Sequence, residues 1–223
     1  MKRILASVAI VAAGLAGTAQ ASDWSGAYIG GHVTGNSISG GMDAHTPWNG
    51  FAGFDLQGVT GGRAGAGVYG GVNWQTGNMV TGLEAELSHV GFKRSTTTGN
   101  LRSDFPRFDR QLEQIAVLTP RIGHAMDAVL IYGRAGLAVG RFASGHLQQG
   151  NEISGRTTRT GWLAGIGVEY RTSPNVSVRA GVDYMDFGRF RTDIAGAGGN
   201  PDIYTMQKAR VTRATLGVTW HFN

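Results

Sequence analysis

The chain of 223 residues contains no cysteine and only five prolines. Disulfides therefore cannot stabilise it, and no segment approaches the eighteen consecutive apolar residues that a membrane-spanning helix requires. The formal net charge is +5, but there is no basic cluster and no basic stripe interleaved with aromatics, which argues against nucleic acid binding. No glycine-rich loop leads into Lys followed by Ser or Thr, which argues against a nucleotide-binding loop.

The first residues have the pattern of a secretory signal peptide. Lys2 and Arg3 precede an apolar stretch over residues 4–16, and the small residues that follow end in Ala21 and Ser22, the expected cleavage point. We therefore expect a signal peptide at 1–21 and one domain at 22–223. Loss of Lys2 and Arg3 would lower the net charge from +5 to +3. An exported chain without disulfides must gain stability in another way, and a closed barrel embedded in lipid is one such way.

What the sequence does contain is alternation, most clearly in two runs at residues 161–171 and 176–185. In each run one face is apolar, while the opposite face carries glycines and charged residues, because side chains alternate sides along a strand. Thr172 to Asn175 supply a turn between the runs. Trp162 and Tyr170 stand at the two ends of the first apolar face, about 20 Å apart in depth for a strand tilted near 40°. This spacing roughly fits the apolar band of an outer membrane.

The same alternation of two faces occurs in eight segments in all. It predicts an all-β fold: an eight-stranded antiparallel up-and-down transmembrane barrel. In the fourth segment Ile115 and Val117 fall on the polar face and Pro120 interrupts the ladder, so it fits least well. The segments cover approximately residues 27–34, 63–75, 79–89, 112–124, 129–141, 161–171, 176–188 and 209–222.

The connections alternate in length, which predicts the orientation of the barrel. Short connections are expected at 76–78, 125–128 and 172–175, and long ones at about 36–61, 90–111, 142–159 and 189–208. Transmembrane barrels have short periplasmic turns and longer extracellular loops. We therefore expect both termini in the periplasm and the long loops outside.

The ionisable residues on the faces opposite the apolar ones are four acids and four bases. An eight-stranded barrel is only just wide enough inside for side chains, so these charges should pair in a confined lumen. A one-residue shift of register would turn the four arginines toward lipid, at about 2–4 kcal/mol each at the midplane. We interpret the set as an electrostatic plug, with proton or ion conduction as the alternative. The predicted lumen charge network consists of Glu84, Glu86, Arg121, Arg134, Glu169, Arg179, Asp183 and Arg213.

Aromatic residues recur near the ends of the apolar faces, where they favour anchoring at the membrane interface over carbohydrate stacking. The predicted interface aromatics are Trp162, Tyr170, Tyr184, Trp220 and Phe222, and Trp24 and Trp74 are assigned the same role.

Four segments carry a resemblance to a known family: WSGAYIGGHVTG, GWLAGIGVEY, VRAGVDYMDFG and RATLGVTWHF. Together they resemble the outer-membrane beta-barrel family related to the OmpA transmembrane domain, and more narrowly the outer-membrane immunogenic proteins of alphaproteobacteria. The resemblance extends over essentially the whole mature chain.

The shared pattern includes Gly165, Gly167, Glu169 and Tyr170, and a lumen arginine of the last strand matches Arg213. Two departures are Gly181, where the family commonly has glutamate, and Asn223, which follows Phe222 where the family commonly ends on Phe.

The resemblance implies a structural protein of the bacterial outer membrane that stabilises the envelope and displays surface loops. It implies contact with outer-membrane lipids and lipopolysaccharide, and recognition of the C-terminal strand by the barrel assembly machinery. No cofactor, metal or catalytic residue is expected.

Three other functions are the alternatives to this one. A soluble ligand carrier of the lipocalin type has the same period with the apolar face inside. Lipid A deacylases and palmitoyltransferases also use eight-stranded barrels, but the deacylase arrangement of a Ser two residues from a His is missing, and Ser88 and His89 point to opposite sides. Loop binding of haemin or a host ligand would use His45 and His146 in outer loops, near Met42 and Trp48 for the first.

Overall fold

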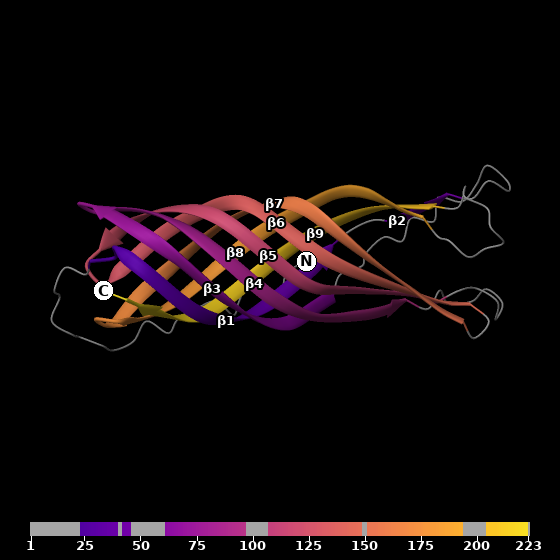
Figure 1. The fold of residues 1–223 in the computed structure, drawn as a ribbon, viewed down its shortest axis with the longest axis horizontal. Coiled ribbons are helices and arrows are strands. Elements are labelled where there is room, and N and C mark those ends of the chain that lie inside the picture. Colours follow the sequence, from indigo (N-terminus) through magenta and orange to yellow (C-terminus); the bar gives the residue numbers. More distant parts are fainter. Residues whose placement is uncertain are drawn as a thin grey trace, which may run out of the picture.

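The computed structural model describes residues 23–39, 42–45, 61–96, 107–148, 151–193 and 204–222, and side chains over 23–39, 64–91, 112–142, 157–189 and 209–222. These residues form one antiparallel sheet that closes on itself, because β1 pairs with β3 on one side and with β9 on the other. Figure 1 shows the resulting barrel with its steeply tilted strands. The prediction of an eight-stranded antiparallel barrel is confirmed. Its strands are β1 (Gly26–Ser39), β3 (Gly61–Thr76), β4 (Met79–Thr96), β5 (Arg107–Met126), β6 (Val129–Gln148), β7 (Asn151–Ser173), β8 (Val176–Asp193) and β9 (Tyr204–His221).

A ninth strand, β2 (Met42–His45), was not predicted. It adds to β9 beyond the barrel, with Met42 opposite Gln207 and His45 opposite Tyr204. The described residues contain no helix that could cross a bilayer.

The short connections are two-residue turns at one end of the barrel. Gly77–Asn78 joins β3 to β4, residues 127–128 join β5 to β6, and residues 174–175 join β7 to β8. Gly77 and Asp127 adopt positive φ angles of 58° and 50°, as tight hairpin turns require. Each turn lies within the connection predicted for it, and β9 also ends at this side of the barrel (Figure 1).

The long connections were predicted too long, because the strands continue far beyond the apolar band. The predicted loop at 142–159 is mostly a hairpin: β6 and β7 stay paired from Arg141 opposite Thr158 to Gln148 opposite Asn151. The strands contain 14 to 23 residues, whereas about 9–11 span a membrane. The alternation in the sequence reveals only the part of each strand that has one apolar face. Outside lipid, two paired strands need no apolar face, so the sequence shows no alternation there.

Beyond the band the closed sheet divides. Pairing between β7 and β8 stops at Trp162 opposite Asp186, whereas β8 and β9 remain paired to Asp193 opposite Tyr204. Figure 1 shows β8, β9 and β2 diverging from the hairpins of β5, β6 and β7 at this end. The outer part of the molecule is therefore made of extended strands rather than of irregular loops alone.

Where faces were predicted, the described side chains confirm them. On β7, Ile166 is 72% exposed, whereas Leu163 and Glu169 are each 1% exposed. The weakest segment, β5, follows the same rule, with Ile115 and Val117 buried inside and Leu118 and Ile122 exposed outside. Pro120 pairs with Leu83 on β4, but the described pairs with β6 pass from Leu118 to Arg121. The predicted interruption thus affects one of the two ladders, since proline has no N–H to donate.

Candidate functional site: the charge network of the lumen

All eight residues of the predicted lumen network lie inside the barrel and are at most 7% exposed. They come from six strands, with Glu84 and Glu86 on β4, Arg179 and Asp183 on β8, and one residue from each of β5, β6, β7 and β9. Their side chains meet because every second residue along a strand points toward the barrel axis. The positions that point inward are called the inward parity of the strand. The four acids and four bases balance in formal charge.

Glu84 is the centre of the network. Its Oε1 accepts from Arg134 Nη1 at 2.6 Å, and its Oε2 accepts from Arg179 Nη1 at 2.6 Å and from Arg121 Nη1 at 3.3 Å. The hydroxyl of Tyr28 also donates to Oε2, at 2.9 Å. One buried carboxylate thus contacts three guanidinium groups.

Asp183 and Glu86 organise the part of the network nearer the outer end. Arg134 binds Asp183 through two bonds, Nε to Oδ1 at 2.9 Å and Nη2 to Oδ2 at 2.7 Å. Arg213 bridges the two acids, since its Nη2 lies 2.9 Å from Asp183 Oδ2 and 3.0 Å from Glu86 Oε2. Paired donors of this geometry form strong charge-assisted bonds, which fix the side chains as well as neutralise them.

The register of the strands places charged residues opposite one another. Glu169 is opposite Arg179, and Asp183 is opposite Arg213, so two pairs of opposite charge arise within the ladder. Arg121 and Arg134, however, face each other across β5 and β6, and like charges in that position repel. Glu84 contacts both, and Arg121 Nη2 also donates to Glu169 Oε2 at 3.1 Å.

Aromatic rings hold two of the arginines and were missed as members of the network. The guanidinium carbon of Arg179 lies 3.2 Å from the ring centroid of Tyr69, and that of Arg121 lies 4.2 Å from Tyr132. Such cation–π contacts are strongest where water is removed. The alternation along the strands could have identified both tyrosines, because each lies at a position whose side chain points into the lumen.

Two buried serine–histidine pairs were also missed. Ser88 Oγ donates to Glu86 Oε1 at 2.7 Å and lies 2.9 Å from His32 Nε2. Ser177 Oγ donates to Glu169 Oε1 at 2.5 Å and lies 2.8 Å from His221 Nε2. A search for serine and histidine on one strand could not find them, because the partners lie on different strands.

Apolar side chains close the lumen at the end with the short turns. Trp24 is fully buried there with Val80, Ala125, Leu130 and Tyr132, and its ring meets the ring of His221 edge-on at 5.7 Å. The prediction that Trp24 anchors the barrel at the membrane interface is wrong. The residue precedes β1, so strand parity does not govern its direction, and it folds into the mouth of the barrel instead.

A larger apolar cluster occupies the lumen on the other side of the charges. The order of the apolar and charged layers can be followed along β4. Its buried residues run from the apolar Val80 through Glu84 and Glu86 to the apolar Val90. The charges are thus enclosed between two apolar layers. The members of the outer cluster are Val90, Leu112, Ile115, Val117, Ala138, Leu163, Met185, Phe187, Ala209 and Val211.

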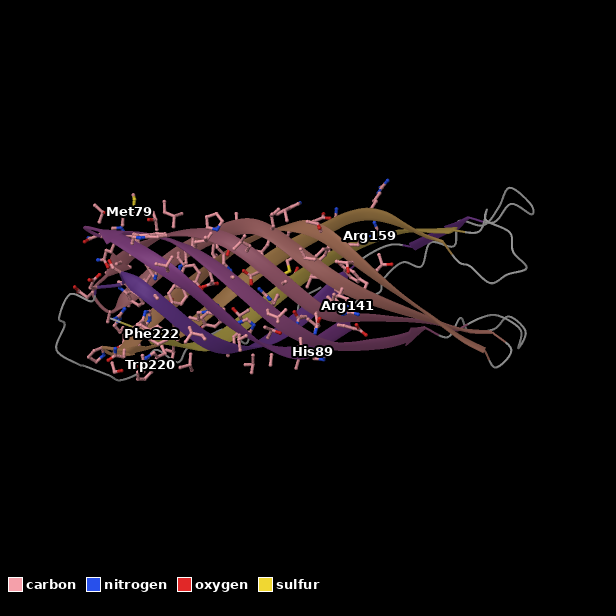
Figure 2. The ribbon with its side chains drawn as sticks, viewed as in Figure 1. Met79, His89, Arg141, Arg159, Trp220 and Phe222 are labelled. Atoms are coloured by element: carbon pink, nitrogen blue, oxygen red, sulfur yellow. The ribbon has the colours of Figure 1, made fainter. Side chains whose placement is uncertain are left out.

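The outside of the barrel carries the apolar band that faces lipid. Figure 2 shows Met79, Trp220 and Phe222 near the short-turn end, and His89, Arg141 and Arg159 toward the other end. Trp220 and Phe222 are exposed by 52% and 62%. Of the other predicted interface aromatics, Trp74, Trp162 and Tyr184 are also exposed on the outer face and Tyr170 is partly exposed.

The described residues contain no group of three or more His, Asp or Glu arranged to hold a metal ion. The backbone of His45 lies in β2 and that of His146 in β6, so their assignment to loops is wrong, and their side chains are outside the described residues. The predicted signal peptide, with Ala21 and Ser22, and Asn223 are also outside them.

Comparison with known proteins agrees with the fold and the placement in a membrane. Residues 5–222 match the model of the outer membrane protein beta-barrel domain family. The chain belongs to this family. As a member of the outer membrane beta-barrel family it resides in the bacterial outer membrane.

Among its relatives is the 22 kDa outer membrane protein of Rhizobium leguminosarum bv. viciae, 29% identical over 168 residues, which are 75% of this chain and 66% of that protein. The 25 kDa outer-membrane immunogenic protein of Brucella canis is 26% identical over 59% of this chain and 55% of its own length. The chain thus spans between about half and two thirds of these relatives. The solved structure of OprG from Pseudomonas aeruginosa has the same fold, with a TM-score of 0.54 and 14% identity over 88% of this chain and 97% of OprG.

Proposed function

We propose that this protein is a structural barrel of the outer membrane that stabilises the envelope, displays its extended outer strands at the surface, and passes neither solutes nor ions. The single observation that supports this proposal is the layering of the lumen. Charged side chains fill its centre, and an apolar cluster lies on each side of them. An ion crossing the barrel would have to displace both clusters and break buried ion pairs.

The burial of the serine–histidine pairs supports a role without catalysis. Ser88 and Ser177 are 1% and 0% exposed, and each hydroxyl donates a hydrogen bond to a glutamate carboxylate. The acyl ester bond of a lipid could not reach the hydroxyl oxygen of Ser88 or of Ser177 while the lumen is filled. The proposal therefore includes no hydrolysis or transfer of acyl chains.

Planar-bilayer recording of the purified, folded full chain tests the closed lumen. We expect no stepwise conductance under conditions in which a sixteen-stranded porin opens a water-filled channel. Unheated samples on SDS gels should migrate differently from heated ones, which shows that the recorded protein is folded. Steady single-channel conductance from such folded protein would contradict the proposal.

Mass spectrometry of lipid A after incubation with the same preparation tests the second part. The number of acyl chains should stay unchanged. A change in that number that depends on Ser177 or Ser88 would show that the barrel is an enzyme.

A further inference from the structure

The outer end of the barrel leaves one side of β7 without a partner strand. Beyond Trp162, which is opposite Asp186, no strand of the described residues pairs with β7 on the side of β8. On its other side β7 stays paired with β6 as far as Asn151 opposite Gln148. We refer to residues 151–161 of β7 as the free edge, which extends about 33 Å along the strand. It lies beyond the aromatic residues of the outer interface, and its backbone is therefore outside lipid.

The backbone groups of β7 alternate between its two sides. The N–H of Arg171 donates to the carbonyl of Ala128, just before β6. The register between β6 and β7 contains no shift, so every second residue counted from Arg171 directs its N–H and C=O toward β6. The residues between them direct these groups to the other side. On the free edge these residues are Glu152, Ser154, Arg156, Thr158 and Thr160. They present hydrogen-bond donors and acceptors to a further strand.

The other outer edges of the described residues have features that hinder the addition of a strand. In β8 the register shifts between Asp186 and Arg189, with Gly188 at a φ of 70°, and in β4 it shifts between His89 and Phe92. β2 contains four residues, and β3 extends by four residues beyond its pairing with β4. Bulges and short strands are known means of protecting sheet edges. The free edge of β7 has no register shift against β6 and no proline, so among these edges it is the best suited to pair with a further strand.

The charges on the two sides of the split favour one kind of strand. Where the closed sheet divides, the free edge lies on one side and residues 187–193 of β8 lie on the other (Figure 1). The charged residues of these two stretches are Arg156, Arg159, Arg189 and Arg191 against Glu152 and Asp193. Like charges that face each other across a ladder repel, whereas opposite charges attract. A second copy of β7 would bring the arginines of both copies into one ladder, whereas an acidic strand would pair with them.

We propose that the free edge of β7 binds an extended, acidic segment of another protein as an additional strand. Main-chain hydrogen bonds along the free edge supply the affinity, and the arginines supply the preference for acidic side chains. The inference rests on the proposed display of the outer strands at the surface and not on the closed lumen. Bilayer recording and the binding test below can therefore fail independently of each other.

The test uses the purified, folded full chain in nanodiscs of neutral lipid and a fluorescent synthetic peptide of about ten residues in which glutamate alternates with valine. Fluorescence anisotropy measures the dissociation constant of this peptide. We expect saturable binding, weaker binding when lysine replaces glutamate, and no binding when the glutamate peptide is N-methylated throughout, because it then cannot donate hydrogen bonds. Absence of binding by the glutamate peptide, or equal binding by the lysine peptide, would overturn the proposal. Equal binding by the methylated peptide would overturn it in favour of attraction between charges alone.

Substitutions on the free edge locate the bound peptide. Thr158→Pro removes an N–H that is directed away from β6, so the hairpin keeps its hydrogen bonds, and affinity should fall about two- to tenfold, the contribution of one hydrogen bond. The matched control Thr158→Ala changes the same exposed side chain but keeps the N–H, and should leave affinity unchanged.

Arg159→Gln tests the preference for acidic side chains. It should weaken binding of the glutamate peptide about two- to fivefold without weakening that of the lysine peptide. Equal affinities of Thr158→Pro and Thr158→Ala would overturn the placement at this edge. A dimer of the purified chain that the peptide dissociates would overturn the proposal in favour of a second copy.

Discussion

Removal of the charge of Glu84 is the sharpest perturbation of the lumen. Glu84→Gln keeps the shape of the side chain and one acceptor oxygen, but leaves three carboxylates against four guanidinium groups. Arg134 retains Asp183 and Glu86, and Arg121 retains Glu169. Arg179 has no other carboxylate within ion-pair distance among the contacts of the described residues, and it is 4% exposed. One buried positive charge thus loses its counter-ion.

The expected loss of unfolding free energy is about 3–5 kcal/mol, the usual consequence of breaking a buried ion pair by removing one partner. The assay is urea unfolding of the barrel in liposomes, followed by tryptophan fluorescence and by the mobility of unheated samples on gels. Ala85→Leu, the next residue on the strand but on the lipid side, should change the free energy by less than about 0.5 kcal/mol.

A double substitution separates charge from shape. Glu84→Gln combined with Arg179→Gln restores neutrality, so the double variant should be more stable than the sum of the two single losses predicts, by about 0.5–3 kcal/mol. If Glu84→Gln unfolds at the same urea concentration as Ala85→Leu, the network does not stabilise the barrel and the reasoning fails.

Three further predictions use the same unfolding assay. Gly165→Ala should cost about 1–3 kcal/mol, because a Cβ there would collide with Asp183, whereas Gly31→Ala should be tolerated since its Cβ would lie 3.8 Å from the nearest atom; equal stability of the two would contradict the packing of the lumen. Ile166→Arg should cost about 2–4 kcal/mol, and no loss would mean that this face does not meet lipid. Trp24→Ala should cost about 3–5 kcal/mol, and an unchanged midpoint would refute its role in closing the lumen.

Much of the fold could be predicted because strand parity is a strict rule. Once Ile166 and Val178 are assigned to lipid, the same parity places Glu169 and Arg179 inside, and the structure has them there. The cost of turning arginine toward lipid makes the alternative register unfavourable, so the sequence pattern and the energetics agree.

Contacts across the lumen could not be predicted in the same way. Parity states that His32 and Ser88 point inward, but it does not state which inward residues meet, since that depends on the shear and diameter of the closed barrel. The apolar lumen residues were hidden for a related reason. Ile115 and Val117 broke the expected pattern of a polar inner face, and only their shared position in the outer cluster explains the exception.

The central claim is that apolar side chains meet acyl chains while the charges lie inside a closed barrel. Photolabelling of the unaltered chain in membranes with an apolar carbene reagent, followed by mass spectrometry, tests this claim most directly. We predict modification of Ile166 and Val178 with Leu163, Met185, Arg134 and Arg179 unmodified. Modification of Leu163 and Met185 with Ile166 and Val178 unmodified would show that the faces are reversed.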